Sequence, residues 1–285
     1  MEGHGGHGAH DHHGAHGSGA LDWAVVDALA LTALLLAATA YAAALWASRH
    51  RSPWPRRRTA AWAAGLFCAG LGVLGPVAAA ARESFTAHMA GHLLLGMLAP
   101  LLLVLGSPIA LALRALPQPR ARALSRVLRH PVVRWLTHPV VAGALNAGGL
   151  WLLYATELYG AMHRSAAVFA LVHLHLLLAG YLFTASLVGV DPDPHRASFR
   201  LRAGVLIVFI AAHSILAKWL WAHPPAGVEP ADGRVGAELM YYGGDAVDVI
   251  LIVLLFAGWF RATRPRGANA GSPGPDPISA EKRAG

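Results

Sequence analysis

Seven apolar segments, each close to the roughly 20 residues that a helix needs to cross a bilayer, dominate this chain. Only α-helices and closed barrels satisfy every backbone polar group inside lipid, and apolar segments of this length form helices rather than barrel strands. The pattern therefore predicts an all-α, polytopic transmembrane bundle of seven helices. The expected helices cover residues 21–47, 59–80, 87–113, 139–158, 165–189, 203–222 and 237–260.

The rest of the chain is too short for a second sizeable domain, since 55% of its 285 residues are hydrophobic and only 13% are charged. We expect a tail at residues 1–19, the membrane domain at 20–261 and a disordered cytoplasmic tail at 262–285. Gly and Pro inside membrane helices commonly mark kinks. Kinks are expected at Gly75, Pro76, Pro100, Gly106 and Pro108.

Basic residues are distributed very unevenly between the two ends of the predicted helices. Nineteen fall in the first, third and fifth connections and the C-terminal tail, and three (Arg82, Arg164 and Arg234) fall on the opposite side. The positive-inside rule places the nineteen in the cytoplasm. The N-terminus is then outside and the C-terminus inside. The nineteen are Arg49, Arg51, Arg56, Arg57, Arg58, Arg114, Arg120, Arg122, Arg126, Arg129, Arg134, Arg196, Arg200, Arg202, Arg261, Arg264, Arg266, Lys282 and Arg283.

This clustering also excludes nucleic acid as a partner, although the sequence pI is about 10.4. The arginines lie in short groups between apolar runs rather than along one amphipathic face. The stretch from Arg114 to Arg134 has two interpretations, a cytoplasmic surface helix or a charged loop that only fixes topology, and the loop is favoured. The single cysteine, Cys68, lies in an apolar run and is expected to be a small buried hydrophobe, so disulfides and cysteine-based metal sites within the chain are excluded.

The N-terminal tail is a low-complexity repeat of glycine and histidine, which cannot form a packed core and is expected to be disordered. It lacks the basic start of a signal peptide, so we expect it to be retained. Such a tract suits loose binding of copper, zinc or nickel, and the alternative is a solvated tail without a role or one that only buffers metal. Its histidines are His4, His7, His10, His12, His13 and His16.

Four further histidines occupy one layer in the outer half of the predicted bundle. His88 and His92 are four residues apart and share a helix face, with His88 at the outer surface. At 1.5 Å per residue, His92, His173 and His213 lie about 7, 12 and 13 Å from the outer ends of their helices. Polar groups at such depth usually face a bundle interior or an aqueous cavity. The alternative for each histidine is a buried imidazole bonded to a neighbouring helix.

Imidazole is the commonest metal ligand, and thioethers add affinity for Cu(I), so this layer predicts a copper site better than a calcium or magnesium site. His173 and His175 are two residues apart and point about 160° apart on a helix, so both cannot face one centre. Carboxylates in the same layer could orient the imidazoles or pair with a lysine. The possible accessory residues are Met89, Met97, His175, Asp245, Asp248 and Lys218.

The run H-M-A-G-H also has the spacing of the zinc-protease helix H-E-x-x-H, but Met89 occupies the position of the glutamate that would act as general base. Intramembrane proteolysis is therefore excluded.

Four stretches carry a resemblance to a known family. They are H-M-A-G-H-L-L-L-G-M-L-A-P-L-L-L-V-L-G-S-P from His88, H-L-H-L-L-L-A-G-Y-L-F from His173, G-V-D-P-D-P-H-R from Gly189 and A-H-S-I-L-A-K-W-L from Ala212. Over residues 60–261 the chain resembles the CtaG-type assembly proteins of bacterial caa-type cytochrome c oxidase, and L-M-Y-Y-G-G-D-A-V-D from Leu239 resembles the actinobacterial branch. The poly-histidine tail lies outside the family pattern.

The resemblance implies a multi-pass protein of the bacterial plasma membrane that takes part in maturing the copper-containing oxidase. His88, His92, His173 and His213 fall on the family's motif positions. We therefore expect a non-enzymatic assembly factor that binds or delivers copper on the outer side, with oxidase subunits or other copper chaperones as partners. The alternatives are a copper or small-solute transporter, a haem-binding membrane oxidoreductase, and a scaffold that binds no metal.

Overall fold

In the computed structural model, which describes residues 15–191 and 196–264 with side chains from Asp22 onward, every regular element is helical. The all-α prediction is therefore confirmed for the described ranges. The elements are α1 (Ala15–Ala47), α2 (Arg56–Val73), α3 (Gly75–Ala80), α4 (Phe85–His92), the π-helix η1 (Leu93–Leu98), α5 (Ala99–Leu105), α6 (Pro108–Ala115), α7 (Gln118–Leu128), α8 (Pro131–Leu136), α9 (Pro139–Ala155), α10 (Leu158–Arg164), α11 (Ala166–Val188), α12 (Phe199–Ala222) and α13 (Pro230–Thr263).

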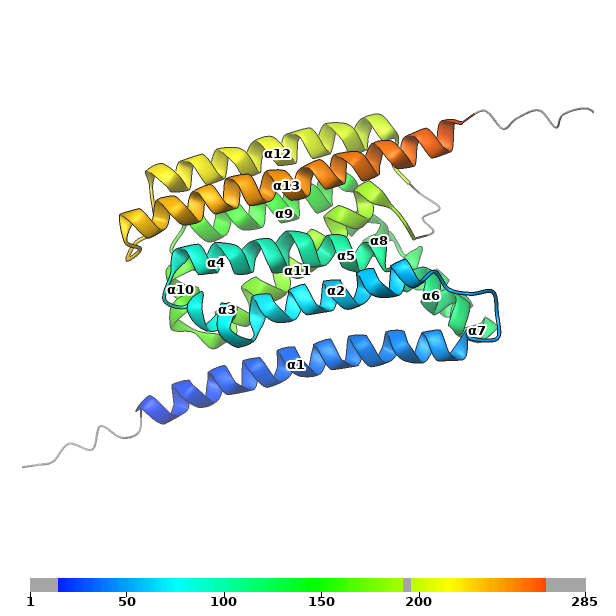
Figure 1. Ribbon diagram of the computed structural model, residues 1–285, viewed down its shortest axis with the longest axis horizontal. Helices are drawn as coiled ribbons and strands as arrows, with labels where there is room; N and C mark the ends of the chain where they lie inside the picture. Colours follow the sequence, from blue (N-terminus) through cyan, green and yellow to red (C-terminus); the bar gives the residue numbers. More distant parts are fainter. Residues whose placement is uncertain (1–14, 192–195, 265–285) are drawn as a thin grey trace, which may run out of the picture.

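Six of the described helical stretches are long and apolar enough to cross a membrane, or seven if α9 and α10 form one span. That pair is bent by 78°, because α9 stops at Ala155 and α10 starts again at Leu158. The predicted count of seven therefore includes one broken span. The described chain begins and ends at opposite ends of the bundle (Figure 1), as an odd number of spans requires. Which end faces outward stays a prediction, and we call the end with α10 and the α12–α13 connection the outer end.

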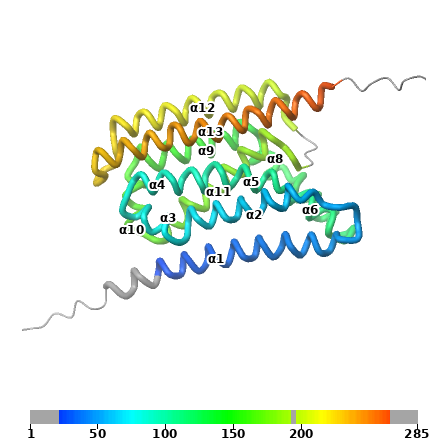
Figure 2. The backbone as a smooth tube through the Cα atoms, viewed as in Figure 1, coloured from blue at the N-terminus to red at the C-terminus, as the bar shows by residue number. Residues whose placement is uncertain are grey.

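The helices run roughly side by side, with α12 and α13 paired along their length and α1 at the opposite edge (Figure 2). α1 is the most exposed span and packs against α2, α6 and α11. Near the end of α1 that lies away from the outer end, Tyr41 stacks on Trp62 with ring centroids 4.8 Å apart and donates a 3.0 Å hydrogen bond to the carbonyl of Gly106. α1 is thus a peripheral helix held by a buried tyrosine at the end away from the candidate site.

Two helix breaks occur at expected positions, one at Gly75 and Pro76 and one between Gly106 and Pro108, whereas α5 continues through Pro100. α2 ends at an extended Leu74, and Gly75 has φ +73°, which a residue with a Cβ adopts only with strain. The chain then re-enters a helix at Pro76. A second break separates α5 from α6, where Ser107 is left-handed with φ 50°. Neither break prevents the flanking helices from forming one continuous span.

Two expectations about the ends of elements need correction. α1 begins at Ala15, so the last five residues of the tail predicted to be disordered are helical, although Gly17 and Gly19 lower the helix propensity of this segment. The favoured loop between Arg114 and Arg134 is wrong, because α7 and α8 occupy most of it. Leu and Val recur at helical spacing along α7 between its arginines, which gives it one apolar face.

The described residues of the G-V-D-P-D-P-H-R stretch, 189–191 and Arg196, have a structural role at the end of the bundle opposite the outer end. α11 ends at Gly189 with φ +51°, and the guanidinium of Arg196 donates a 2.7 Å hydrogen bond to the carbonyl of Val188. The Asp191 carboxylate accepts a 2.9 Å hydrogen bond from the backbone N–H of Ala110 in the first turn of α6. This motif therefore joins α11 to α6 and satisfies backbone groups at both helix ends.

Candidate metal centre

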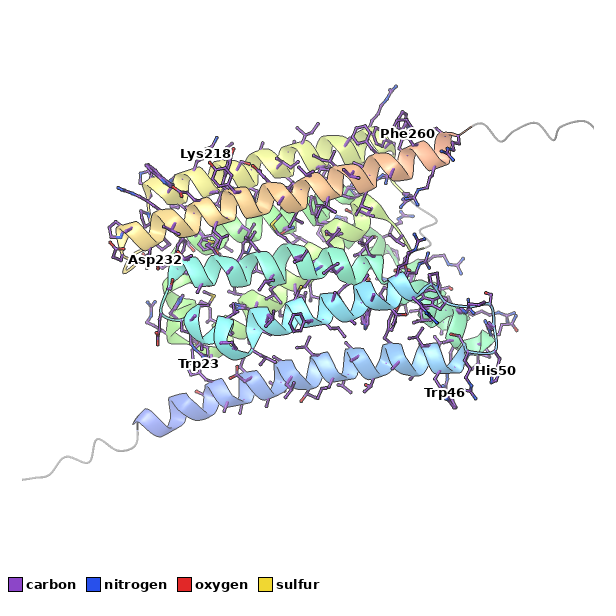
Figure 3. All side chains as sticks on the ribbon, in the orientation of Figure 1. Trp23, Trp46, His50, Lys218, Asp232 and Phe260 are labelled. Carbon is purple, nitrogen blue, oxygen red and sulfur yellow. The ribbon has the colours of Figure 1, made fainter. Side chains whose placement is uncertain are left out.

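A carboxylate from α13 fixes the first turn of α4, which carries the two predicted histidines. Asp232, at the outer end of α13 (Figure 3), accepts hydrogen bonds from the backbone N–H groups of Phe85 at 2.6 Å and Thr86 at 3.1 Å. It also accepts one from the Ser84 hydroxyl at 3.0 Å. The four N–H groups at a helix start lack intrahelical partners, so a carboxylate there is stabilising. Asp232 thereby sets the position of α4, and with it the position of both imidazoles.

His88 lies in the outer core, where only 4% of its surface is exposed. Its Nε2 is hydrogen-bonded to the hydroxyl of Tyr154 on α9 at 3.0 Å. The same hydroxyl is 3.8 Å from the Met89 sulfur, so Tyr154 contacts both residues of α4. The His88 ring meets His173 edge to face, with centroids 6.5 Å apart.

His92 lies one turn deeper and faces His213 of α12. The two rings are nearly parallel, with an interplanar angle of 20° and centroids 6.2 Å apart, and both side chains are buried. Among the described residues, none of their four ring nitrogens has a hydrogen-bond partner. The buried carboxylate of Asp248 on α13 likewise has no partner in the described chain. His92, His213 and Asp248 are therefore the side chains of the histidine layer whose hydrogen-bonding atoms are unsatisfied.

Glycine on α13 makes room for the deeper pair. A Cβ added at Gly244 would lie 3.0 Å from Nδ1 of His213 and closer still to Cε1. The imidazole therefore rests directly against the backbone of α13. Asp248 follows Gly244 by one turn and shares its helix face.

His173 and His175 leave α11 in different directions, as their spacing predicts. Nδ1 of His173 donates to the carbonyl of Phe169 in its own helix at 2.9 Å, so Nε2 carries the lone pair. Nε2 of His175 instead donates to the carbonyl of Leu145 on α9 at 3.1 Å. His175 therefore links α11 to α9, on a different side from His88.

A π-helical turn, η1, follows His92 directly. Its wider ring of i→i+5 hydrogen bonds is uncommon and is frequent at functional sites. Gly180 of α11 crosses here, where an added Cβ would overlap the carbonyl oxygen of Gly96 and lie 2.9 Å from Pro100. This close approach brings α11, and therefore His173, against the helix that carries His88 and His92.

The accessory residues occupy different surroundings. Met89 has no exposed surface and packs in the outer core, whereas Met97 packs in the apolar cluster of the inner half. Lys218 is exposed on α12 (Figure 3), with its ammonium 5.2 Å from the centre of the Tyr241 ring. Asp245 is half-buried.

Three outer residues escaped the sequence analysis: Tyr154, Tyr159 and His163. The His163 ring lies 4.5 Å from Tyr159 and 6.1 Å from His88, between centroids. Tyr159 and His163 are four residues apart, which would have put them on one helix face. That signal was missed because α10 has only seven residues and lies beyond a sharp bend.

The four predicted ligands thus form two neighbouring pairs, His88 with His173 and His92 with His213. No three His, Cys, Asp or Glu side chains converge as a ready metal site within the described residues. A shared ion held by His92, His173 and His213 stays a prediction. His4, His7, His10, His12 and His13 lie outside the described residues, and the side chain of His16 is not described.

Below the histidine layer, the inner half is closed by a cluster of eleven buried residues. They are Met97, Leu101, Ala142, Phe183, Leu187, Val188, Leu206, Phe209, Val247, Leu251 and Leu255. The fold and the site together define a multi-pass membrane protein with a buried imidazole layer near one surface and an apolar core beneath it.

Comparison with known families identifies its class. The chain belongs to the family of cytochrome c oxidase caa3 assembly factors (Caa3_CtaG), whose model matches residues 39–262. This confirms the resemblance and extends it towards the N-terminus. The apolar spans and the family together fit a multi-pass bacterial membrane protein.

Curated relatives come from mycobacteria. The chain is 29% identical to the uncharacterized protein ML1998 of Mycobacterium leprae over 84% of this chain and 40% of that protein. It is 36% identical to the uncharacterized proteins Mb0105 of Mycobacterium bovis and MT0111 of Mycobacterium tuberculosis, over 66% of this chain and 30% of each. The chain therefore spans less than half the length of these relatives. No solved structure matches the chain.

Proposed function

We propose that the chain acts in oxidase assembly by binding copper as cargo at its outer histidine layer and handing it to oxidase subunits or to another copper chaperone. His88, His92, His173 and His213 hold the metal, and the role is one of binding and transfer rather than catalysis.

The observation that carries the proposal is the set of unpartnered nitrogens on His92 and His213. A buried polar group without a hydrogen bond costs about 1–3 kcal/mol. Two imidazoles on two helices therefore destabilise the empty fold unless a ligand satisfies them. A metal ion bound through their lone pairs would remove that cost.

The donor set fits a soft or borderline metal. Neutral imidazole suits copper and zinc, whereas calcium and magnesium require several oxygen ligands. Met89 adds a thioether within the same outer core, next to Tyr154 and His88. Asp248 supplies a buried carboxylate that could balance the charge of a cation in this layer or orient an imidazole.

The apolar cluster of the inner half favours binding and return to the outer side over conduction. A transported cation would have to pass Leu101, Phe183 and Leu251, which are each no more than 3% exposed and offer no ligand atoms. A buried charge without partners is strongly disfavoured there. A hand-over site open to the outer end avoids this barrier.

The test measures Cu(I) bound by purified protein without oxygen, using a chain that lacks residues 2–17 so that the tail histidines do not contribute. His92→Ala and His213→Ala are expected to remove tight binding, and to lower oxidase activity in a host that lacks its own copy, while the protein still inserts.

His175→Ala is the matched control, because it removes an imidazole from the same layer that already has a backbone partner. It should retain copper and lose only stability, by about 0.6–2 kcal/mol for an interhelical hydrogen bond in a membrane. Full copper binding by His92→Ala and His213→Ala together would leave the scaffold role and reject the metal site.

A further inference from the structure

We infer that His163, which lines a cavity on the outer end of the bundle, is the access ligand through which copper reaches the buried histidines. This inference rests on the proposed function, and it adds a site residue and a route that the four-histidine site does not contain.

The cavity has a volume of about 400 Å³ and is formed by three connections that meet at the outer end. The α3–α4 connection contributes Glu83, α10 contributes His163, and the residues before α13 contribute Glu229. Both glutamates are exposed, and so are Arg82 and Arg164, which line the same cavity. Their charges balance, so the cavity offers carboxylate and imidazole ligands to a cation without a strongly negative field.

His163 lies between this cavity and the buried layer. It lines the cavity, is half-buried, and its ring centroid is 6.1 Å from that of His88. His88 in turn is 6.5 Å from His173. Two imidazoles that share one ion at about 2.0–2.1 Å each have ring centroids roughly 5–6 Å apart. The distances of 6.1 and 6.5 Å are slightly longer than this range, so the rings of each successive pair would have to move closer to share an ion.

The tautomer of His163 is suited to this role. Its Nδ1 donates to the carbonyl of Tyr159 at 2.9 Å, so Nε2 keeps its lone pair. His173 has the same arrangement with Phe169. A metal-binding histidine typically donates its second ring N–H to such an acceptor, which fixes the ring. His163 and His173 are thus fixed in the same way, on either side of His88.

The test separates the rate of copper exchange from the amount of copper bound. The background is the full-length chain with the six tail histidines replaced by asparagine. Cu(I) uptake and removal are followed in stopped flow with a chromophoric Cu(I) chelator. His163→Ala and the bulkier His163→Gln should bind the same amount of copper as the background, yet exchange it about tenfold more slowly, which corresponds to about 1.4 kcal/mol on the barrier.

His163→Cys should restore fast exchange, because a thiolate is also a ligand for Cu(I). His223→Ala is the matched control. His223 lies at the same end, directly after α12, and is exposed. Its Nδ1 bonds to the carbonyl of Trp219 at 3.2 Å, and it lines a neighbouring cavity that does not include His163. Its removal should leave the exchange rate unchanged.

Unchanged exchange in both His163→Ala and His163→Gln would overturn the inference, as would an equal slowing in His223→Ala. A lower copper content in the His163 variants would also overturn it, because His163 would then be a resident ligand. Failure of the proposed function is recognised separately, since the background chain itself would then bind no copper.

Discussion

Replacing Gly244 by alanine tests whether the His213 imidazole is held against α13. The added methyl group would lie 3.0 Å from Nδ1 of His213, against 3.4–4 Å for ordinary contact, and closer still to Cε1. The ring must therefore shift out of its present position or leave its rotamer, because the contact to Cε1 is far shorter than an ordinary contact. Overpacking a buried site costs about 1–3 kcal/mol.

Alanine also has a higher helix propensity than glycine, by about 1 kcal/mol, and this offsets part of the cost. Gly258 on the same helix separates the two effects, because a Cβ there would meet nothing within 4 Å. Gly258→Ala should gain up to about 1 kcal/mol from helix propensity alone. The two variants should then differ in unfolding free energy by about 1–3 kcal/mol, which is the overpacking term.

The assay is unfolding in mixed detergent micelles, paired with Cu(I) affinity from chelator competition. Displacing the His213 ring should weaken copper binding about 10- to 100-fold in Gly244→Ala, as loss of a supporting contact typically does, and should leave Gly258→Ala unchanged. Equal stability of the two variants would refute the packing argument. Equal copper affinity, with the predicted loss of stability present, would show that His213 is not a ligand.

Two further predictions concern topology and the tail. A reporter fused to the C-terminus should be active only in the cytoplasm, because nineteen basic residues are expected on that side and three on the other. Activity of that fusion outside the cell would show that the predicted membrane orientation is reversed. Removal of residues 2–17 should lower the total metal content while oxidase assembly continues in copper-replete cells, because histidines spaced by glycine bind divalent metals weakly; complete loss of the oxidase would contradict this.

The fold followed from the sequence because length and hydrophobicity act locally. A run of about 20 apolar residues has few alternatives to a spanning helix, so the six long spans were predictable. The fourth span was harder to predict, because its break between Ala155 and Leu158 depends on how α10 packs at the outer end. Between Arg114 and Arg134 a loop was favoured over a surface helix, because charge alone does not distinguish the two.

The depth of the site histidines in the bundle could be predicted from the sequence, but not which imidazoles contact one another. Counting residues from the helix ends placed His92, His173 and His213 in one layer. Which imidazoles meet depends on helix rotation and on close approaches at Gly180 and Gly244, which no spacing rule contains. His163 could not be assigned, because its position depends on the bend before α10.

The outer and inner imidazoles differ in how well the empty protein satisfies them. His163 and His173 each donate to a carbonyl of their own helix, and His88 is bonded to Tyr154. By contrast, His92 and His213 have no hydrogen-bond partner within the described chain. A cation that moves inward would therefore gain most at the deepest pair, where it relieves unsatisfied groups in a low-dielectric setting. On the proposed function, affinity rises along the route from the cavity to His213. Release to the oxidase then requires a partner at the outer end that offers stronger ligands than two imidazoles.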